Sequence, residues 1–198
     1  MQNVQGNIYS WINRYRKPFL WVHGILFVAL WFFTRPLWPF PNLILAELAE
    51  GLGGLLLIAG VIGRMYSSLT IASYKNTRVV KTEMYSVVRH PLYFFSFMMA
   101  IGVGLLTGRV ELLVYICIFF FACFYPIIRH EEKNLESKFG QEYAEYRKQV
   151  PMLIPNFWKW TAREKMEINM RLVTRTILDG SLPLLFFPVL EIIEAIHG

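Results

Sequence analysis

Two short segments of this sequence hold the side chains that could carry chemistry. The first runs from Tyr85 to Tyr93 and contains the triplet Arg89-His90-Pro91. Proline suits the first turn of a helix, because its missing N–H would have no partner there. We therefore expect a helix to begin at Pro91, with Arg89 and His90 at an N-terminus that favours an anion. The simpler interpretation is that Arg89 reaches lipid phosphate and His90 caps the helix.

The second segment begins at Arg129-His130-Glu131-Glu132 and reaches Pro155. Several of its residues follow three- and four-residue steps, so we expect them to share a helix face. They are Glu132, Leu135, Phe139, Tyr143 and Tyr146. Gly140 is expected to interrupt this helix or to let another backbone approach. On periodicity alone, the simpler interpretation is an amphipathic helix that lies on a membrane with its carboxylates in water.

Several common kinds of site are not predicted. His130 beside two glutamates does not form the His-Glu-x-x-His zinc pattern, so we predict no metal site. Cys117 and Cys123 are six positions apart and do not share a helix face, which gives no support to a disulfide framework. The sequence contains no glycine-rich phosphate loop and no strand–helix alternation, so a Rossmann-type cofactor domain is excluded.

The composition indicates a membrane protein. Of 198 residues, 55% are hydrophobic and 17% charged, and the mean hydropathy is +0.39. Soluble domains carry about a quarter charged residues, so a soluble two-domain enzyme would lack the polar residues to cover its surface. The aromatic fraction of 16% suits a chain that lines two membrane–water interfaces.

Four stretches approach the length of about 20 apolar residues that a helix needs to cross a bilayer. We predict spans at 19–38, 43–74, 92–107 and 110–128, the second with its apolar part ending near Gly63. Only two residues separate the last two spans, so they must form a tight antiparallel hairpin. The first stretch lacks a small-residue cleavage site after it, and we interpret it as a retained helix rather than a signal peptide.

The cations predict the orientation. With the N-terminus in the cytosol, 18 of the 20 Lys and Arg fall on the inner side, and only Arg35 and Arg109 lie outside. This asymmetry follows the positive-inside rule, and it explains the net charge of +6 without nucleic acid. The connection before the third span and the segment after the fourth then emerge on the same, cytosolic face. We expect a multi-pass protein of a prokaryotic inner membrane.

The two segments together resemble the isoprenylcysteine carboxyl methyltransferase family and its phospholipid N-methyltransferase relatives. The resemblance covers residues 43–158 and depends on order and spacing rather than on any single element. The matching residues of the first segment are Tyr85, Arg89-His90-Pro91 and Tyr93. Those of the second are Glu131-Glu132, Leu135, Phe139-Gly140, Glu142-Tyr143, Tyr146, Val150-Pro151 and Ile154-Pro155.

The resemblance implies an integral membrane methyltransferase that uses S-adenosylmethionine and modifies a membrane lipid or lipidated acceptor. In this family the two segments form the walls of a cytosolic cofactor pocket. Arg89 joins the implied contacts because it can hold the carboxylate of the cofactor. The predicted cofactor-binding residues are Tyr85, Arg89, His90, Tyr93, Glu131, Glu132 and Tyr143. Glu142 and Arg147 (or Lys148) fall where the family places polar groups near the methyl acceptor, and they are the predicted catalytic residues.

The sequence departs from the family pattern at three places. The family often has Thr-Gly-Pro where this chain has Thr82-Glu83-Met84, and a glycine where it has Phe94-Phe95. A tail also extends beyond the usual end. Within it, residues 163–178 predict an interfacial amphipathic helix. The short apolar segment 182–196 is a candidate fifth span, re-entrant hairpin, or docking or dimer element.

The sequence thus predicts an all-α integral membrane protein with four to five transmembrane helices and a cytosolic helical C-terminal segment. We divide it into a methyltransferase core at 1–160, including the cytosolic segment 129–155, and the tail at 161–198. Two other functions stay open at this point. One is an NADPH-dependent reductase of the sterol type, which resembles the same family. The other is a non-catalytic membrane interaction protein.

Overall fold

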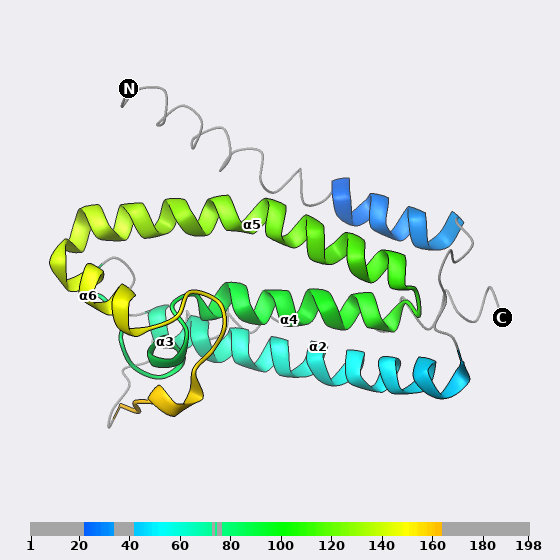
Figure 1. Cartoon of the computed structure of the whole chain (residues 1–198), viewed down its shortest axis with the longest axis horizontal. Helices are drawn as coiled ribbons and strands as arrows, with labels where there is room; N and C mark the ends of the chain where they lie inside the picture. Colours follow the sequence, from blue (N-terminus) through cyan, green and yellow to red (C-terminus); the bar gives the residue numbers. More distant parts are fainter. Residues whose placement is uncertain (1–21, 34–41, 73, 75–76, 164–198) are drawn as a thin grey trace. The chain divides into compact units, whose positions relative to one another are not determined.

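The computed structural model describes residues 22–33, 42–72, 74 and 77–163, and all regular structure in these residues is helical (Figure 1). The all-α prediction is therefore confirmed for this part of the chain. The outer ends of the first predicted span, the amphipathic helix of the tail and the apolar segment 182–196 lie outside the described residues.

The chain divides into two units, residues 1–37 and 38–198. In the first unit the structure describes an apolar helix, Val22–Phe33. It falls within the predicted span 19–38. The rings of Phe32 and Phe33 meet edge to face at 4.9 Å between centroids.

In the second unit, the described residues form three long helices and three short ones. The long helices are α2 (Leu43–Ala72), α4 (Pro91–Leu106) and α5 (Val110–Phe139). The short ones are α3 (Met84–Val87), α6 (Gln141–Gln149) and the single 3₁₀ turn η1 (Phe157–Lys159). Figure 1 shows the long helices side by side, each antiparallel to the next along the chain, with the three short elements together at one end.

Glycines let α2 and α4 approach closely. A Cβ atom on Gly102 would lie 2.7 Å from the carbonyl oxygen of Gly53, and one on Gly60 would lie 2.9 Å from that of Phe95. Backbone atoms cannot move away as a flexible side chain can, so glycine is needed at these crossings. The close packing expected for the glycines of the second span is found at Gly53, Gly60 and Gly63.

The α4–α5 pair forms the predicted tight hairpin. Its turn contains Gly108, whose φ of +66° favours glycine. Along the hairpin, the ring of Phe97 contacts those of Phe120 and Phe121, with centroids 4.9 Å and 4.8 Å apart. These aromatic contacts fix how α4 and α5 pack, and so they set where the N-terminus of α4 lies beside the second half of α5.

Helix α5 joins the predicted fourth span, 110–128, to the predicted cytosolic helical segment that begins at 129, because it continues without a break through Pro126 to Phe139. The polar residues from Arg129 onward are therefore a rigid continuation of the apolar helix. The helix ends at Gly140, whose φ of +52° breaks the helical backbone. No atom lies within 4 Å of a Cβ built on Gly140, so it interrupts the helix rather than allowing a close approach.

After the break, α6 turns back to build a small core. Tyr143, Tyr146 and Val150 are buried together and pack against Val79, Leu135 and Phe139. The predicted common face is thus correct in its members, although Gly140 splits it between two helices. From Val150 to Arg163 the chain, which we call the return segment, runs back past α3 (Figure 1).

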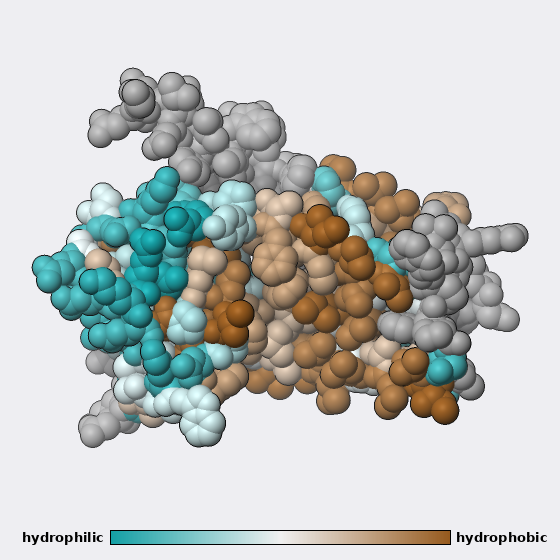
Figure 2. All heavy atoms as spheres, viewed as in Figure 1, coloured by the Kyte–Doolittle hydropathy of each residue, from teal (hydrophilic) through white to brown (hydrophobic). Residues whose placement is uncertain are grey.

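Among the described residues of this unit, two helices are long and apolar enough to cross a membrane. They are Ile44–Ala72 and Val110–Phe139, and α4 is apolar but shorter. Most residues in their most apolar stretches are not buried, unlike those of a core helix in a soluble protein. Figure 2 shows hydrophobic residues over the long helices and hydrophilic ones gathered at the end that holds α6. This surface indicates a membrane protein.

Candidate functional site

The N-terminus of α4 is built as the sequence predicted. Pro91 occupies the first turn of the helix, and His90 stands at the capping position. The backbone carbonyl of His90 accepts hydrogen bonds from the N–H groups of Tyr93 and Phe94, at 3.1 Å and 3.0 Å. The His90 side chain makes no capping hydrogen bond. Its imidazole is buried and points instead toward α5.

Glu132 of α5 is the point where the two segments meet. Its side chain is only 2% exposed, and Oε1 lies 2.8 Å from Arg89 Nη1 and 3.3 Å from His90 Nε2. The second oxygen, Oε2, accepts a hydrogen bond from Arg129 at 3.2 Å. A buried carboxylate needs such partners, because burial without them would be costly. The predicted convergence of the two segments is thus present in the structure.

The surroundings of Glu132 favour its charged form. Burial alone would raise the pKa of this carboxyl. The hydrogen bond with His90 and the positive charge of Arg89 outweigh burial, and together they hold the pKa below its ordinary value. Glu132 is therefore an anion at neutral pH, placed between cations from both segments.

Tyr93 and Glu131 form a second link between α4 and α5. The Tyr93 hydroxyl donates to Glu131 Oε1 at 2.8 Å. The Tyr93 ring also packs against Phe124, with centroids 5.6 Å apart, and lies 6.0 Å from the His90 ring. Both members of this pair were predicted site residues, and the structure brings them together one turn from the centre of the site.

Helix α6 supplies two buried tyrosines. Tyr146 donates its hydroxyl hydrogen bond to the backbone carbonyl of Tyr85 at 2.7 Å, which fixes α6 against α3. Tyr143 is 2% exposed, and within the described part of the chain its hydroxyl has no hydrogen-bond partner. Burial, with a smaller contribution from the charge of Glu132, raises the pKa of Tyr143 to about 12. Tyr143 is therefore a neutral, unpartnered donor beside Glu132.

The Arg89 guanidinium also has buried donor groups that make no hydrogen bond to the described residues. Its Nε is buried without a hydrogen-bond partner among the described residues, and Nη1 meets Glu132 as an ion pair outside hydrogen-bond geometry. Buried donors without a partner are uncommon in folded proteins. Together with the Tyr143 hydroxyl, they leave a set of donors that a bound polar molecule could satisfy.

The two predicted catalytic residues lie outside this buried cluster. Glu142 pairs with Lys81 at 3.0 Å, and Arg147 pairs with Glu136 at 3.2 Å. All four side chains are between 39% and 51% exposed. They belong to α6 and its neighbours but face the solvent.

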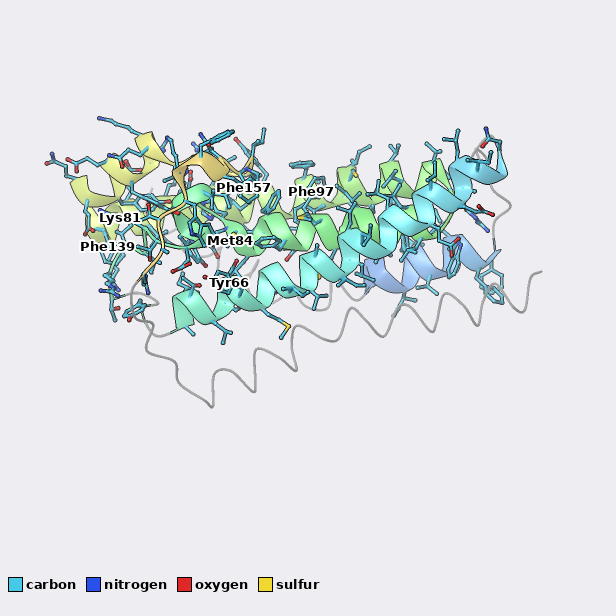
Figure 3. All side chains as sticks on the ribbon, turned by 90° about the horizontal axis from the view of Figure 1, so that it is seen from below. Tyr66, Lys81, Met84, Phe97, Phe139 and Phe157 are labelled. Atoms are coloured by element: carbon cyan, nitrogen blue, oxygen red, sulfur yellow. The ribbon has the colours of Figure 1, made fainter. Side chains whose placement is uncertain are left out.

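Sequence reasoning missed a network around Glu83. The carboxylate accepts hydrogen bonds from the Tyr66 hydroxyl on α2 and from the backbone N–H of Arg163, the latter at 2.8 Å. Glu83 is buried and adopts a φ of +56°, a conformation that favours glycine. The one available signal was that glutamate stands where the family pattern often has glycine. Figure 3 shows Tyr66 on α2 close to Met84, the residue that follows Glu83.

The return segment pairs with the wall that carries Tyr85 and Arg89. The Arg89 N–H donates to the Pro151 carbonyl at 2.8 Å, and the Asn156 N–H donates to the Val87 carbonyl at 2.9 Å. Further along, the Glu83 N–H donates to the Thr161 carbonyl at 2.8 Å. These bonds satisfy backbone groups on both sides of α3 within 82–89 and hold this segment in place.

No group of three or more His, Cys, Asp or Glu among the described residues could hold a metal ion.

The phospholipid methyltransferase family model matches residues 52–142, a range that includes the wall of 85–93 and the carboxylates of α5. No solved structure matches the chain.

Three curated relatives are similar to this chain. The nickel-cobalt-cadmium resistance protein of Alcaligenes xylosoxydans xylosoxydans is 28% identical over 60% of this chain and 55% of its own length. The cobalt-zinc-cadmium resistance protein of Cupriavidus metallidurans is 27% identical over 74% and 67%. The protein-S-isoprenylcysteine O-methyltransferase of Schizosaccharomyces pombe is 32% identical over 47% and 40%.

The chain therefore spans about two fifths to two thirds of the length of these relatives. The predicted resemblance to the isoprenylcysteine and phospholipid methyltransferase family is confirmed. The family model and the isoprenylcysteine relatives are named as methyltransferases, and the matches do not favour the reductase or the non-catalytic alternative.

Proposed function

We propose that this chain, a relative of the phospholipid methyltransferases, is a membrane methyltransferase that uses S-adenosylmethionine and acts on a lipidic or hydrophobic acceptor at the cytosolic membrane surface. The observation that carries the proposal is the meeting of Arg89 and His90 with Glu132 at the polar end of the helices. These residues come from the two segments on which the family resemblance depends.

The chemistry of this cluster fits the cofactor. S-adenosylmethionine carries a carboxylate, an ammonium, a ribose diol and a sulfonium. Arg89 has a buried, unpartnered Nε and stands beside the N-terminus of α4, so it suits the carboxylate. Glu131 and Glu132 suit the ammonium or the diol. The neutral hydroxyl of Tyr143 is a further donor, and the Tyr93 ring offers an aromatic face to the sulfonium.

When bound, the cofactor supplies an electrophilic methyl group. Transfer of this group is an in-line displacement, so the task of the protein is mainly to position the two reactants. The ion pairs and hydrogen bonds around Glu132 join α4 and α5, and Tyr146 joins α6 to α3. Tyr93 and Glu132 are thereby held on two joined helices, and Tyr143 is held on α6, which packs against α5.

The acceptor side of the reaction is assigned to α6. Glu142 and Arg147 lie on it in exposed ion pairs, which exchange partners at little cost. Arg147 would orient an anionic acceptor, such as a carboxylate. An amine acceptor would need a base, for which Glu142 is the candidate.

The test is methyl transfer in membranes. Membranes that contain the full chain would be incubated with S-adenosylmethionine carrying a labelled methyl group, and lipids and lipidated proteins would be analysed by mass spectrometry. We expect labelled products heavier by one methylene. We expect Arg89→Ala to lose the product and the exposed control Glu145→Gln to retain it. That difference would show that the activity depends on the site. Equal labelling with and without the chain would overturn the proposal.

A further inference from the structure

The return segment presents large apolar side chains to the outside. Ile154, Phe157, Trp158 and Trp160 are all exposed, and Trp158 is 99% exposed. We call residues 154–160 the aromatic loop. Four large apolar residues within seven positions are unusual on a surface that is otherwise polar, and such a patch marks an interaction site. The proposed methyltransferase site does not use them.

The aromatic loop is held in a fixed shape. The Asn156 side chain accepts a hydrogen bond from the Trp158 N–H at 3.2 Å and caps the single turn of η1. The Asn156 backbone N–H donates to Val87 at 2.9 Å, and this ties the loop to the core. The exposed rings are therefore presented by an ordered backbone, which reduces the entropy that binding would cost.

The position of the aromatic loop along the long helices indicates that its partner is the headgroup layer of the membrane. Trp160 stacks on Tyr66 of α2, with ring centroids 6.5 Å apart and nearly parallel planes. The exposed apolar residues of α2 end at Ile62, four residues before Tyr66. At 1.5 Å per residue, Tyr66 lies about 6 Å beyond the apolar surface. This is the depth of the headgroup layer, which adds roughly 5–7 Å to each side of the hydrocarbon core.

The view along the helices agrees with this height. Figure 3 shows Phe157 and Tyr66 at a similar level on the long axis, between Phe97 in the apolar region and Lys81 at the polar end. Tryptophan prefers this boundary, because its ring is apolar and its N–H is polar.

The charge of the surrounding surface also fits a bilayer. Residues 64–91 and 129–163 together carry twelve Lys or Arg and six Glu. Lys159 stands within the aromatic loop between Trp158 and Trp160. A cationic surface with embedded aromatics matches the anionic headgroups of an inner leaflet.

We propose that the aromatic loop is a membrane-interface anchor that inserts Phe157 and Trp158 among the phospholipid headgroups of the cytosolic leaflet. Because the return segment is hydrogen-bonded to 82–89, this anchor also fixes the height of the Arg89 wall relative to the bilayer surface. The proposal requires that the long helices span the membrane with their polar end in the cytosol, and it does not depend on methyl transfer.

The experiment measures tryptophan quenching by brominated phospholipids. The full chain is reconstituted in bilayers whose lipids carry bromine either just below the headgroup or deep in the chains, and the emission of Trp158 is obtained as the difference between the parent and Trp158→Phe. We expect shallow bromine to remove most of this emission and deep bromine to remove little. Trp158 is fully exposed, so its replacement leaves the fold intact.

Two control variants, both made in the Trp158→Phe background, calibrate the depth that the quenching reports. Ile118→Trp, on the exposed apolar part of α5, should be quenched most by deep bromine. Ser137→Trp, near the polar end of α5, should be quenched by aqueous acrylamide and by neither lipid. The proposal is overturned if Trp158 behaves like Ser137→Trp, or if neither lipid nor acrylamide reaches it, which would mean that protein covers the loop. Loss of methyl transfer alone would leave these quenching results unchanged.

Discussion

The imidazole of His90 and the carboxylate of Glu132 lie 3.3 Å apart, although 42 positions separate them in the chain. Two helices of a hairpin intervene, and the contact exists because α4 begins beside the point where α5 leaves its apolar region. The same carboxylate binds Arg89, so one buried glutamate joins the connection before α4 to the polar half of α5.

Replacing Glu132 should destabilise the fold strongly. Glu132→Gln keeps the shape but leaves Arg89 buried without a countercharge, which costs about 3 kcal/mol. For a chain of this size, that corresponds to a fall of roughly 6–12 °C in the melting temperature. Thermal unfolding in detergent measures it. Glu131→Gln is the matched control, because its amide oxygen can still accept the hydrogen bond from Tyr93 and only the acceptor's charge is lost, so the melting temperature should fall by only about 2–4 °C. Equal shifts for both variants would contradict the central place of Glu132.

The Glu132 ion pair also predicts a dependence on pH. The pKa of this carboxyl is lower in the folded protein than the ordinary 4.5. The stabilisation is therefore fully present above the ordinary pKa and is lost as pH falls through the lower, folded value. We expect the melting temperature of the parent to decline as the pH is lowered below about 4.5. Glu132→Gln should lack that part of the decline, and a parallel acid limb in both proteins would refute the assignment.

Tyr143 should separate binding from stability. Tyr143→Phe removes a hydroxyl that is buried without a partner in the described structure, so the melting temperature should stay the same or rise. If the hydroxyl donates to the cofactor, affinity for S-adenosylhomocysteine should fall about fivefold to tenfold, the worth of one hydrogen bond. Tyr146→Phe is the contrasting variant, because it loses the bond to Tyr85 and should lower the melting temperature. Unchanged affinity in Tyr143→Phe would remove this residue from the cofactor site.

Glu83 combines backbone strain with useful hydrogen bonds, and two substitutions distinguish these effects. Glu83→Ala loses the bonds to Tyr66 and Arg163 and keeps the strained φ of +56°. Glu83→Gly loses the same bonds but relieves the strain, which costs of order 1–3 kcal/mol. Both should unfold at a lower temperature than the parent, and Glu83→Ala at the lower of the two. If Glu83→Ala were more stable than Glu83→Gly, the left-handed backbone at this position would not be strained.

Close packing of α2 on α4 predicts unequal responses to alanine at two glycines. Gly102→Ala would place a Cβ 2.7 Å from a backbone oxygen of α2, which forces the helices apart and should lower the melting temperature by several degrees. Gly54→Ala meets no atom within 4 Å and should be neutral or slightly stabilising, because alanine favours helix. Thermal unfolding of both variants in one detergent provides the comparison. A destabilised Gly54→Ala together with a neutral Gly102→Ala would contradict the prediction.

Sequence reasoning predicted that the two segments of the site converge, but it missed the hydrogen bonds of Glu83 that hold the first segment in place. The predicted orientation placed both segments on the same membrane face, and the order and spacing of Pro91, Tyr93 and Glu131-Glu132 identified the residues that meet there. Glu83 was noted only as a departure from the family pattern. Its partners, Tyr66 and Arg163, come from distant parts of the chain, and no local pattern records such pairing.

The helix boundaries show a similar division. Pro91 and Gly140 mark an observed start and an observed end, because their backbone preferences act locally. The polarity change at Arg129 predicted the end of the fourth span but carried no sign that one helix runs through it, since a helix continues across a membrane surface as readily as below it. The exposed ion pairs of Glu142 and Arg147 likewise depend on tertiary placement of α6, which periodicity does not give.

The most direct test of the central claim is calorimetric titration of S-adenosylhomocysteine into the purified full chain in detergent. We predict saturable binding to the parent, unchanged affinity in His130→Ala, and at least a tenfold loss in His90→Ala, because only His90 lies in the buried cluster with Glu132. Absence of binding to the folded parent at millimolar ligand, or equal affinity in all three proteins, would contradict the account.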